Sequence, residues 1–175
     1  MAGNKKNWHT GIALAVLMSG SVIADTAVNF KGNLIIPNCV INNNLPVSVD
    51  FHDVEIQSLE TVNTVYYAQD FGVDMNCPYS AGTPKLTLSA PAVHNAAQGI
   101  IQTSKYTEGL VINIRQKGGG AVIPLNNSTE VTSSVTGIGN LRTLILNAGL
   151  SQFKGMETLT PGPFTASANL QVRYE

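Results

Sequence analysis

The chain has 175 residues, of which 43% are hydrophobic and 12% are charged, and its formal net charge is −1. Lysine and arginine are scattered rather than clustered, which argues against a nucleic-acid partner and against an anionic lipid surface. After residue 24, no stretch approaches the roughly 20 apolar residues of a membrane-spanning helix. The length indicates one domain with a sizeable core.

Residues 1–24 have the pattern of a secretory signal peptide. Lys5 and Lys6 give a basic start, residues 11–18 form a short apolar core, and residues 22–24 are small or branched. We expect cleavage before Asp25. Removing 24 residues and two of the ten basic side chains leaves an exported chain of 151 residues with a net charge of −3.

Residues 25–38 follow this leader and alternate between apolar and polar positions. One face of the predicted strand carries Val28, Phe30, Gly32, Leu34 and Ile36. Gly32 leaves a gap on the face that should be packed. Two interpretations remain open: an ordinary first strand with a bulge at Gly32, or a strand that inserts into a groove on another molecule.

Cys39 and Cys77 are the only cysteines of the chain. An even pair in an oxidising compartment predicts a disulfide, and closing a loop of this length would stabilise the fold by about 4 kcal/mol. His52 and His94 are isolated in the sequence, so we expect no metal site.

The rest of the chain alternates with a period of two, as β-strands do. We predict strands at residues 45–51, 73–77, 85–90, 109–115 and 141–146. Turn-forming residues separate these strands, and at most one helical turn is expected within residues 98–107. Short strands spaced by turns indicate a single all-β sandwich.

The clearest alternation lies at the end of the chain, in residues 164–174. Its apolar face consists of Phe164, Ala166, Ala168, Leu170, Val172 and Tyr174. Because the sequence stops one residue later, at Glu175, we expect the edge of this strand to be left uncovered.

Four stretches carry a resemblance to a known family: residues 30–39, 49–59, 76–79 and 162–166. Together with the cysteine pair and both terminal strands, they resemble the pilins of chaperone–usher fimbriae, and most of all the tip-fibrillum subunits of P pili. Pilins of this family end with a penultimate tyrosine and a glycine fourteen residues from the end, which Tyr174 and Gly162 match. Rod, tip-fibrillum and adaptor subunits share these features.

The resemblance implies an incomplete immunoglobulin-like β-sandwich that lacks its seventh strand. A periplasmic chaperone lends such pilins a strand, and at the outer-membrane usher the N-terminal extension of the next subunit replaces it. By position, residues 25–38 are the donor-strand extension and residues 39–175 the pilin domain. The resemblance assigns Val28, Phe30, Gly32, Leu34 and Ile36 to the donor face, matches Cys39–Cys77 to the family disulfide, and assigns the groove edge and chaperone contact to Gly162, Phe164, Ala166, Ala168, Leu170, Val172 and Tyr174.

The function that the resemblance implies is that of a structural subunit, exported through the periplasm to a bacterial surface pilus. Its expected partners are the chaperone, the usher, neighbouring pilins and, through them, a tip adhesin. No catalytic residue, metal or cofactor is expected.

Two alternatives were weighed against this interpretation. A carbohydrate-binding adhesin would carry a lectin domain ahead of its pilin domain and would lack the donor strand, and here the only tryptophan, Trp8, lies in the leader. An exported hydrolase would need a nucleophile or metal motif such as Gly-x-Ser-x-Gly or His-Glu-x-x-His, which the sequence lacks. Asp50, His52 and Asp53 are closely spaced, but we expect solvated side chains there.

Overall fold

The computed structural model describes residues 26–175. The predicted leader, residues 1–24, lies outside the described residues. The chain divides into two units, Met1–Asn33 and Leu34–Glu175, which are described separately.

Residues 26–38 are exposed at every position and contain no strand. The apolar side chains of this extension are therefore open to solvent, and the exposed fraction of Phe30 reaches 91%. An apolar row without a covering surface is unusual for a folded chain.

Most of the second unit belongs to a large antiparallel sheet. Its strands in spatial order are β1 (Val40–Ile41), β2 (Tyr66–Asn76), β9 (Leu141–Gln152), β6 (Leu110–Gln116), β5 (Ile100–Gln102) and β4 (Val93–Asn95). A further strand, β8 (Val135–Ile138), forms a hairpin with β9.

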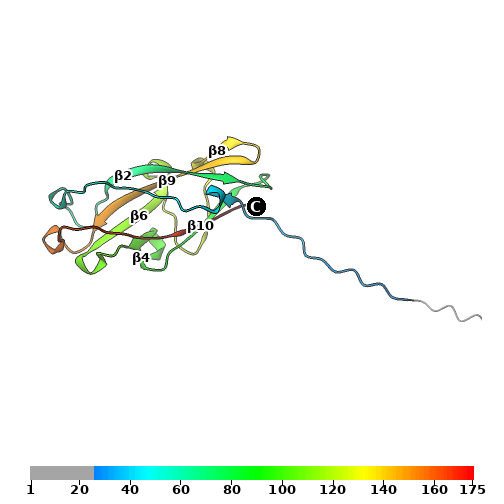
Figure 1. Ribbon diagram of the computed structural model, residues 1–175, viewed down its shortest axis with the longest axis horizontal. Helices are drawn as coiled ribbons and strands as arrows, with labels where there is room; N and C mark the ends of the chain where they lie inside the picture. Colours follow the sequence, from blue (N-terminus) through cyan, green and yellow to red (C-terminus); the bar gives the residue numbers. More distant parts are fainter. Residues whose placement is uncertain (1–25) are drawn as a thin grey trace, which may run out of the picture. The chain divides into compact units, whose positions relative to one another are not determined.

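A smaller sheet packs against the large one. Its strands in spatial order are β10 (Asn169–Tyr174), β3 (Pro84–Ser89) and β7 (Ser128–Glu130). The core between the sheets combines Leu86, Leu88 and Val172 of the smaller sheet with Leu144 and Leu146 of β9, all fully buried. The result is an all-β sandwich of two antiparallel sheets, as the sequence predicts (Figure 1).

Short 3₁₀ turns connect the strands, and no α-helix occurs in residues 26–175. The turns are η1 (Asn42–Asn44), η2 (Ile56–Ser58), η3 (Ala96–Gln98), η4 (Tyr106–Glu108), η5 (Lys117–Gly119), η6 (Thr132–Ser134) and η7 (Met156–Thr158). No helix in this described part has the length and apolar character that crossing a membrane requires.

A local prediction is wrong. Residues 45–51 form no strand, although their sequence alternates, because no other strand lies alongside them to complete a hydrogen-bonded ladder. Within residues 98–107, where at most one helical turn is expected, the structure has β5, and the 3₁₀ turns η3 and η4 overlap the two ends of the range.

Candidate functional site

A long groove opens between two segments whose facing backbone edges have no partner strand. One side consists of the chain after β1, residues 44–59, and the other of the chain leading into β10 together with the first two residues of β10, residues 159–170. Figure 1 shows these two segments, cyan and red, running along the sandwich with β6 and β9 between them. Two cavities of about 810 and 700 Å³ make up the groove and share the side chains of Val49, Phe51 and Phe164.

The floor of the larger cavity is the apolar core itself. It is formed by Phe71, Leu88, Ile101, Ile112, Ile114, Leu146 and Ala148. Apart from the half-buried Phe71, all of these residues are buried and belong to the core cluster. The groove therefore reaches the interior of the sandwich, which a complete sandwich would cover with another strand.

The segment of residues 159–170 (red in Figure 1) presents unpaired backbone groups to this groove. Odd-numbered residues bond away from it: Glu175 exchanges hydrogen bonds with Thr83, and Thr165 accepts one from the backbone N–H of Ser104. In an extended chain, the N–H and C=O of the intervening residues point the other way. This direction is marked by the carbonyl of Val172, which accepts a 2.8 Å bond from the N–H of Cys39.

Upstream of Val172 the same edge has no partner. Among the described residues, none bonds to the backbone N–H or C=O of Phe164, Ala166 or Ala168. Leu170 belongs to the same even-numbered set. The groove thus opens where the pairing between Cys39 and Val172 ends.

The segment of residues 44–59 (cyan in Figure 1) also has backbone groups that make no hydrogen bond. In the described chain, the backbones of Val47, Val49 and Phe51 make no hydrogen bond, while the carbonyl of Asp50 accepts one from the Gln69 side chain. Val49 and Phe51 pack against the core. An extended peptide lying in the groove would therefore meet free donors and acceptors on both sides and an apolar floor below.

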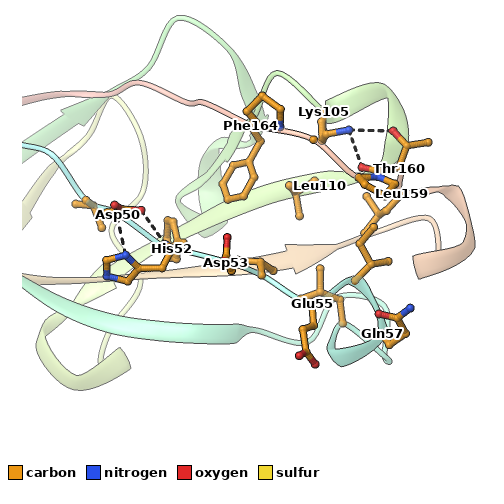
Figure 2. Close-up of a pocket in the computed structure, with 18 residues that line it drawn as sticks. Asp50, His52, Asp53, Glu55, Gln57, Lys105, Leu110, Leu159, Thr160 and Phe164 are labelled. Atoms are coloured by element: carbon orange, nitrogen blue, oxygen red, sulfur yellow. Dashed lines mark hydrogen bonds and ion pairs between the residues drawn. The ribbon is translucent and has the colours of Figure 1, made fainter.

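Two aromatic rings meet across the middle of the groove. Phe51 on one side and Phe164 on the other have ring centroids 6.2 Å apart. Figure 2 shows the Phe164 side chain reaching into the second cavity above Leu110. The pair narrows the groove where its two cavities join.

A charged network holds the far end of the groove edge. The Lys105 ammonium lies 3.0 Å from a carboxylate oxygen of Glu108. It also donates to the carbonyl of Thr160 at 2.8 Å (Figure 2). The backbone N–H of Thr160 donates to Glu108 at 2.7 Å. This N–H, followed by the Lys105 side chain, lowers the pKa of Glu108. The network ties η4 to the chain just before Gly162.

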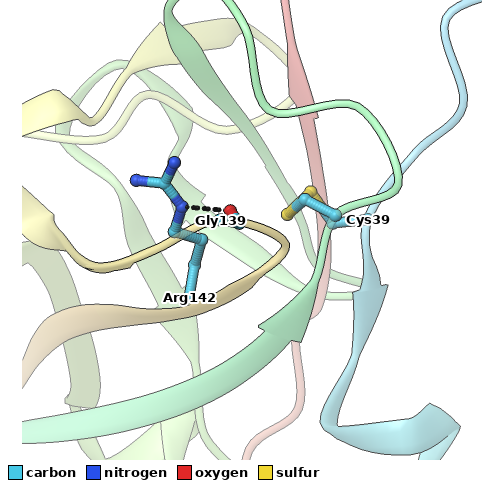
Figure 3. The surroundings of a disulfide bond; sticks show 4 residues. Cys39, Gly139 and Arg142 are labelled. Atoms are coloured by element: carbon cyan, nitrogen blue, oxygen red, sulfur yellow. Dashed lines mark hydrogen bonds between the residues drawn. A yellow bond between two sulfur atoms is a disulfide. The ribbon is translucent and has the colours of Figure 1, made fainter.

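The opposite end of the groove lies beside the disulfide. Cys39 and Cys77 are bonded, as the sequence predicts. The N–H of Cys77 donates to the carbonyl of Asn140 in the β8–β9 turn, which lies next to the disulfide in Figure 3. The disulfide thus attaches the chain that leads into residues 44–59 to the large sheet.

The predicted groove-edge residues divide into two groups. Phe164, Ala166, Ala168 and Leu170 line the groove, together with Gly162 in the second cavity. Val172 and Tyr174 share their face but lie in the core, 0% and 3% exposed, and do not line the groove. The donor-face residues of the extension lie in the exposed residues 26–38.

Sequence reasoning missed the second side of the groove and the charged network. The alternation of residues 45–51 is the sequence signal for this second side of the groove, but the same alternation is also typical of an ordinary paired strand. Asp50, His52 and Asp53 line the rim of the second cavity. The Nδ1 of His52 lies 3.5 Å from Asp50, and both side chains are exposed.

The chain is similar to known fimbrial proteins along most of its length. The family model for fimbrial protein matches residues 28–175. Fimbrial protein PrsE of Escherichia coli is 37% identical over 164 residues, which cover 91% of each chain. The fimbrial adapter PapF of Escherichia coli is 23% identical over 160 residues, covering 91% of this chain and 93% of PapF.

Solved structures show the same fold. The crystal structure of the P pilus rod subunit PapA superimposes with a TM-score of 0.58 at 23% identity, covering 85% of this chain and 100% of PapA. The P pilus adaptor subunit PapF gives a TM-score of 0.53 at 19% identity, covering 82% and 100%. A closer relation to the tip-fibrillum subunit PapE stays a prediction. The chain belongs to the fimbrial protein family, and it is a subunit of a chaperone–usher fimbria.

Proposed function

We propose that this subunit polymerises by donor-strand exchange. Residues 28–36 of one subunit insert as a strand into the groove of its neighbour, and the subunit's own groove accepts a strand first from a periplasmic chaperone and then from the next subunit. Val28, Phe30, Leu34 and Ile36 then face the groove floor, and Gly32 lies at a shallow position. Gly162, Phe164, Ala166, Ala168 and Leu170 form the receiving edge.

The observation that carries this proposal is that backbone N–H and C=O groups on both sides of the groove make no hydrogen bond. Free backbone groups at Val49 and Phe51 on one side and at Phe164, Ala166 and Ala168 on the other flank an apolar floor. Within the described residues, the same chain also carries an exposed alternating segment that pairs with no strand. Main-chain hydrogen bonds supply affinity in such strand addition, while alternate side chains that fill pockets supply specificity. Residues 28–36 and residues 162–170 each comprise nine residues, so the two segments match in length.

Burial of the donor face provides the free energy for assembly. Four apolar side chains at about 1.5–3 kcal/mol each contribute roughly 6–12 kcal/mol, an upper figure because the free extension is not fully extended. The new hydrogen bonds add to this contribution, since they satisfy groups that the open groove leaves unpaired.

We further propose the place of the subunit in its fimbria. The similarity to the fimbrial adapter PapF and to the minor fimbrial protein PrsF of Escherichia coli supports a minor subunit near the tip. Such a subunit is exported through the periplasm, passes the outer-membrane usher, and helps to present an adhesin without catalysing a reaction.

The test compares two matched charges in the extension of the full chain. Leu34→Asp places a carboxylate on the donor face, and Asn33→Asp places the same group on the opposite face. We expect Leu34→Asp to accumulate folded and disulfide-bonded in the periplasm but to be nearly absent from purified fimbriae. Asn33→Asp should enter fimbriae normally. Equal incorporation of the two variants, measured by immunoblot, would overturn donor-strand exchange through this face.

A further inference from the structure

Three apolar side chains form a row across the outer face of the large sheet. Val40 pairs with Asn76, Asn76 pairs with Leu141, and Leu141 pairs with Ile138, so the four residues cross β1, β2, β9 and β8 in register. Directly paired residues point to the same face of a sheet. Met75 is buried, so its neighbour Asn76 points outward, and the row lies on the outer face.

This row is open to solvent. The exposed fractions of Ile138, Leu141 and Val40 are 89%, 71% and 37%. The next outward-facing row consists of Asp74, Thr143 and Thr136, in which the Thr143 hydroxyl donates to the Asp74 carboxylate. The row beside it is therefore polar, and solvation alone does not explain the exposed apolar one.

The row lies at the end of the sandwich from which the extension departs. Val40 directly follows Cys39, and Asn140 in the β8–β9 turn is hydrogen-bonded to Cys77 (Figure 3). The disulfide thus links the row rigidly to the first residue after the extension.

The chain between the donor face and the disulfide is short. Only Pro37 and Asn38 separate Ile36 from Cys39. Three residue steps span at most about 11 Å, even when fully extended. Pro37 also lacks an N–H, so it cannot continue the donated ladder. Any molecule whose groove holds Ile36 must therefore lie within about 11 Å of Cys39.

We propose that the apolar row of Val40, Leu141 and Ile138 packs against the body of the neighbouring subunit that holds this chain's extension. This inference rests on the proposed function. It adds a second contact between consecutive subunits, one that involves the folded bodies and not the donated strand. The short tether identifies the occupant, because it holds the body of that neighbour close to this end of the sandwich.

Photocrosslinking in assembled fimbriae tests the proposal. A benzophenone amino acid is introduced singly at Ile138, at Leu34 in the extension, or at Ser128, an exposed residue of the smaller sheet. After irradiation, intersubunit products are separated by electrophoresis and identified by mass spectrometry. We expect covalent pairs of subunits from positions 138 and 34, involving the same neighbour, and at most traces from position 128.

The outcomes separate the two proposals. Intersubunit products from Leu34 but none from Ile138 would overturn the body contact and leave donor-strand exchange standing. An absence of products at Leu34 would instead contradict donor-strand exchange. Products from Ile138 that join a different subunit from the one captured at Leu34 would also overturn the body contact.

A matched pair of charges gives a second measurement. Ile138→Asp and Thr136→Asp place the same carboxylate on one hairpin, in the apolar row and in the polar row beside it. We expect fibres with Ile138→Asp to dissociate about tenfold faster in denaturant, the loss of one partly buried side chain. Thr136→Asp should leave the rate within about twofold of the wild type. Equal rates for the two variants would refute the contact.

Discussion

Glu108 joins two parts of the chain that lie far apart in sequence. Its carboxylate receives the backbone N–H and the hydroxyl of Thr160 and contacts the ammonium of Lys105. All these partners favour the charged form, so the pKa of Glu108 is lower in the folded protein than in the unfolded chain. The network therefore stabilises the groove end above the ordinary pKa of glutamate, and this contribution is lost as the pH falls through the lowered value.

This linkage predicts a pH-dependent effect of Glu108→Gln. At pH 7 the variant should melt at a lower temperature than the wild type, and the difference should shrink as the pH falls through the lowered pKa of Glu108, below which both side chains are neutral. Thermal unfolding followed by circular dichroism, on subunits carrying a fused donor strand, measures the difference. Glu60→Gln, at an exposed glutamate, is the control. A difference that stays constant from pH 7 to pH 3 would contradict the assigned role of the carboxylate.

The disulfide predicts a large effect on stability. Cys39 and Cys77 close a loop of 38 residues, and in the chain-entropy model this constraint contributes about 4 kcal/mol. The double variant Cys39→Ser with Cys77→Ser should lose most of that free energy of unfolding, measured by urea titration of the strand-fused subunit. A loss below about 1 kcal/mol would show that the β1 segment is held by other contacts.

At the level of the strands, the sequence predicts long paired strands of the core but misses the short paired strands β1, β4, β5, β7 and β8. Residues 73–77, 85–90 and 141–146 alternate because they face a core on one side, and apart from Cys77 and Ala90 at their ends they lie in β2, β3 and β9. β2 starts earlier than its alternation indicates, at Tyr66, and its register shifts between Tyr66 and Gln69. Pairing depends on a neighbour, which a strand's own pattern does not report.

Only part of the candidate site could be predicted, because alternation shows which residues share a face but not what lies beside them. The face shared by Phe164, Ala168 and Leu170 follows from period-two alternation. Alternation does not indicate how deeply each of these side chains is buried. Val172 lies on the same face but is buried in the core, because Cys39 pairs beside it. The contact of Lys105 with Thr160 spans 55 residues, so no local pattern could indicate it.

Charge on the receiving edge should act according to the face on which it lies. Ala168 packs against the core on the groove face of its segment, whereas the neighbouring Ser167 is exposed and lies on the opposite face. We expect Ala168→Glu to reduce chaperone capture in a pull-down by at least about tenfold, because a carboxylate would be buried against the floor. Ser167→Glu should bind like the wild type. Similar losses in both variants would mean that the inferred strand register is wrong.

Gly32 should be intolerant of a large side chain. In the proposed complex Gly32 lies at a shallow position of the groove, which has no room for a large side chain. A peptide of residues 25–38 carrying Gly32→Leu should displace the chaperone from a neighbouring subunit more slowly than the wild-type peptide, with overpacking costing about 1–3 kcal/mol. Equal exchange rates would reduce Gly32 to a simple bulge.

For the whole subunit, the open groove predicts that the isolated protein is unstable and prone to aggregation. Expressed without its chaperone, the protein should aggregate or be degraded, because the groove exposes both apolar floor and unpaired backbone. Fusing a donor strand from a neighbouring subunit to the C-terminus should give a soluble monomer with a much higher melting temperature. A monodisperse wild-type subunit with no added strand, seen by size-exclusion chromatography, would argue against the open groove.

The division between groove floor and donor strand has a genetic consequence. Ile112 and Leu146 lie on one chain, and the proposal assigns the side chains that cover them to another polypeptide. A substitution that enlarges the floor can therefore be compensated only by a change in a different molecule. Where those molecules are products of different genes, suppressor mutations of floor variants should map to the neighbour's extension, so that two loci together encode one hydrophobic core.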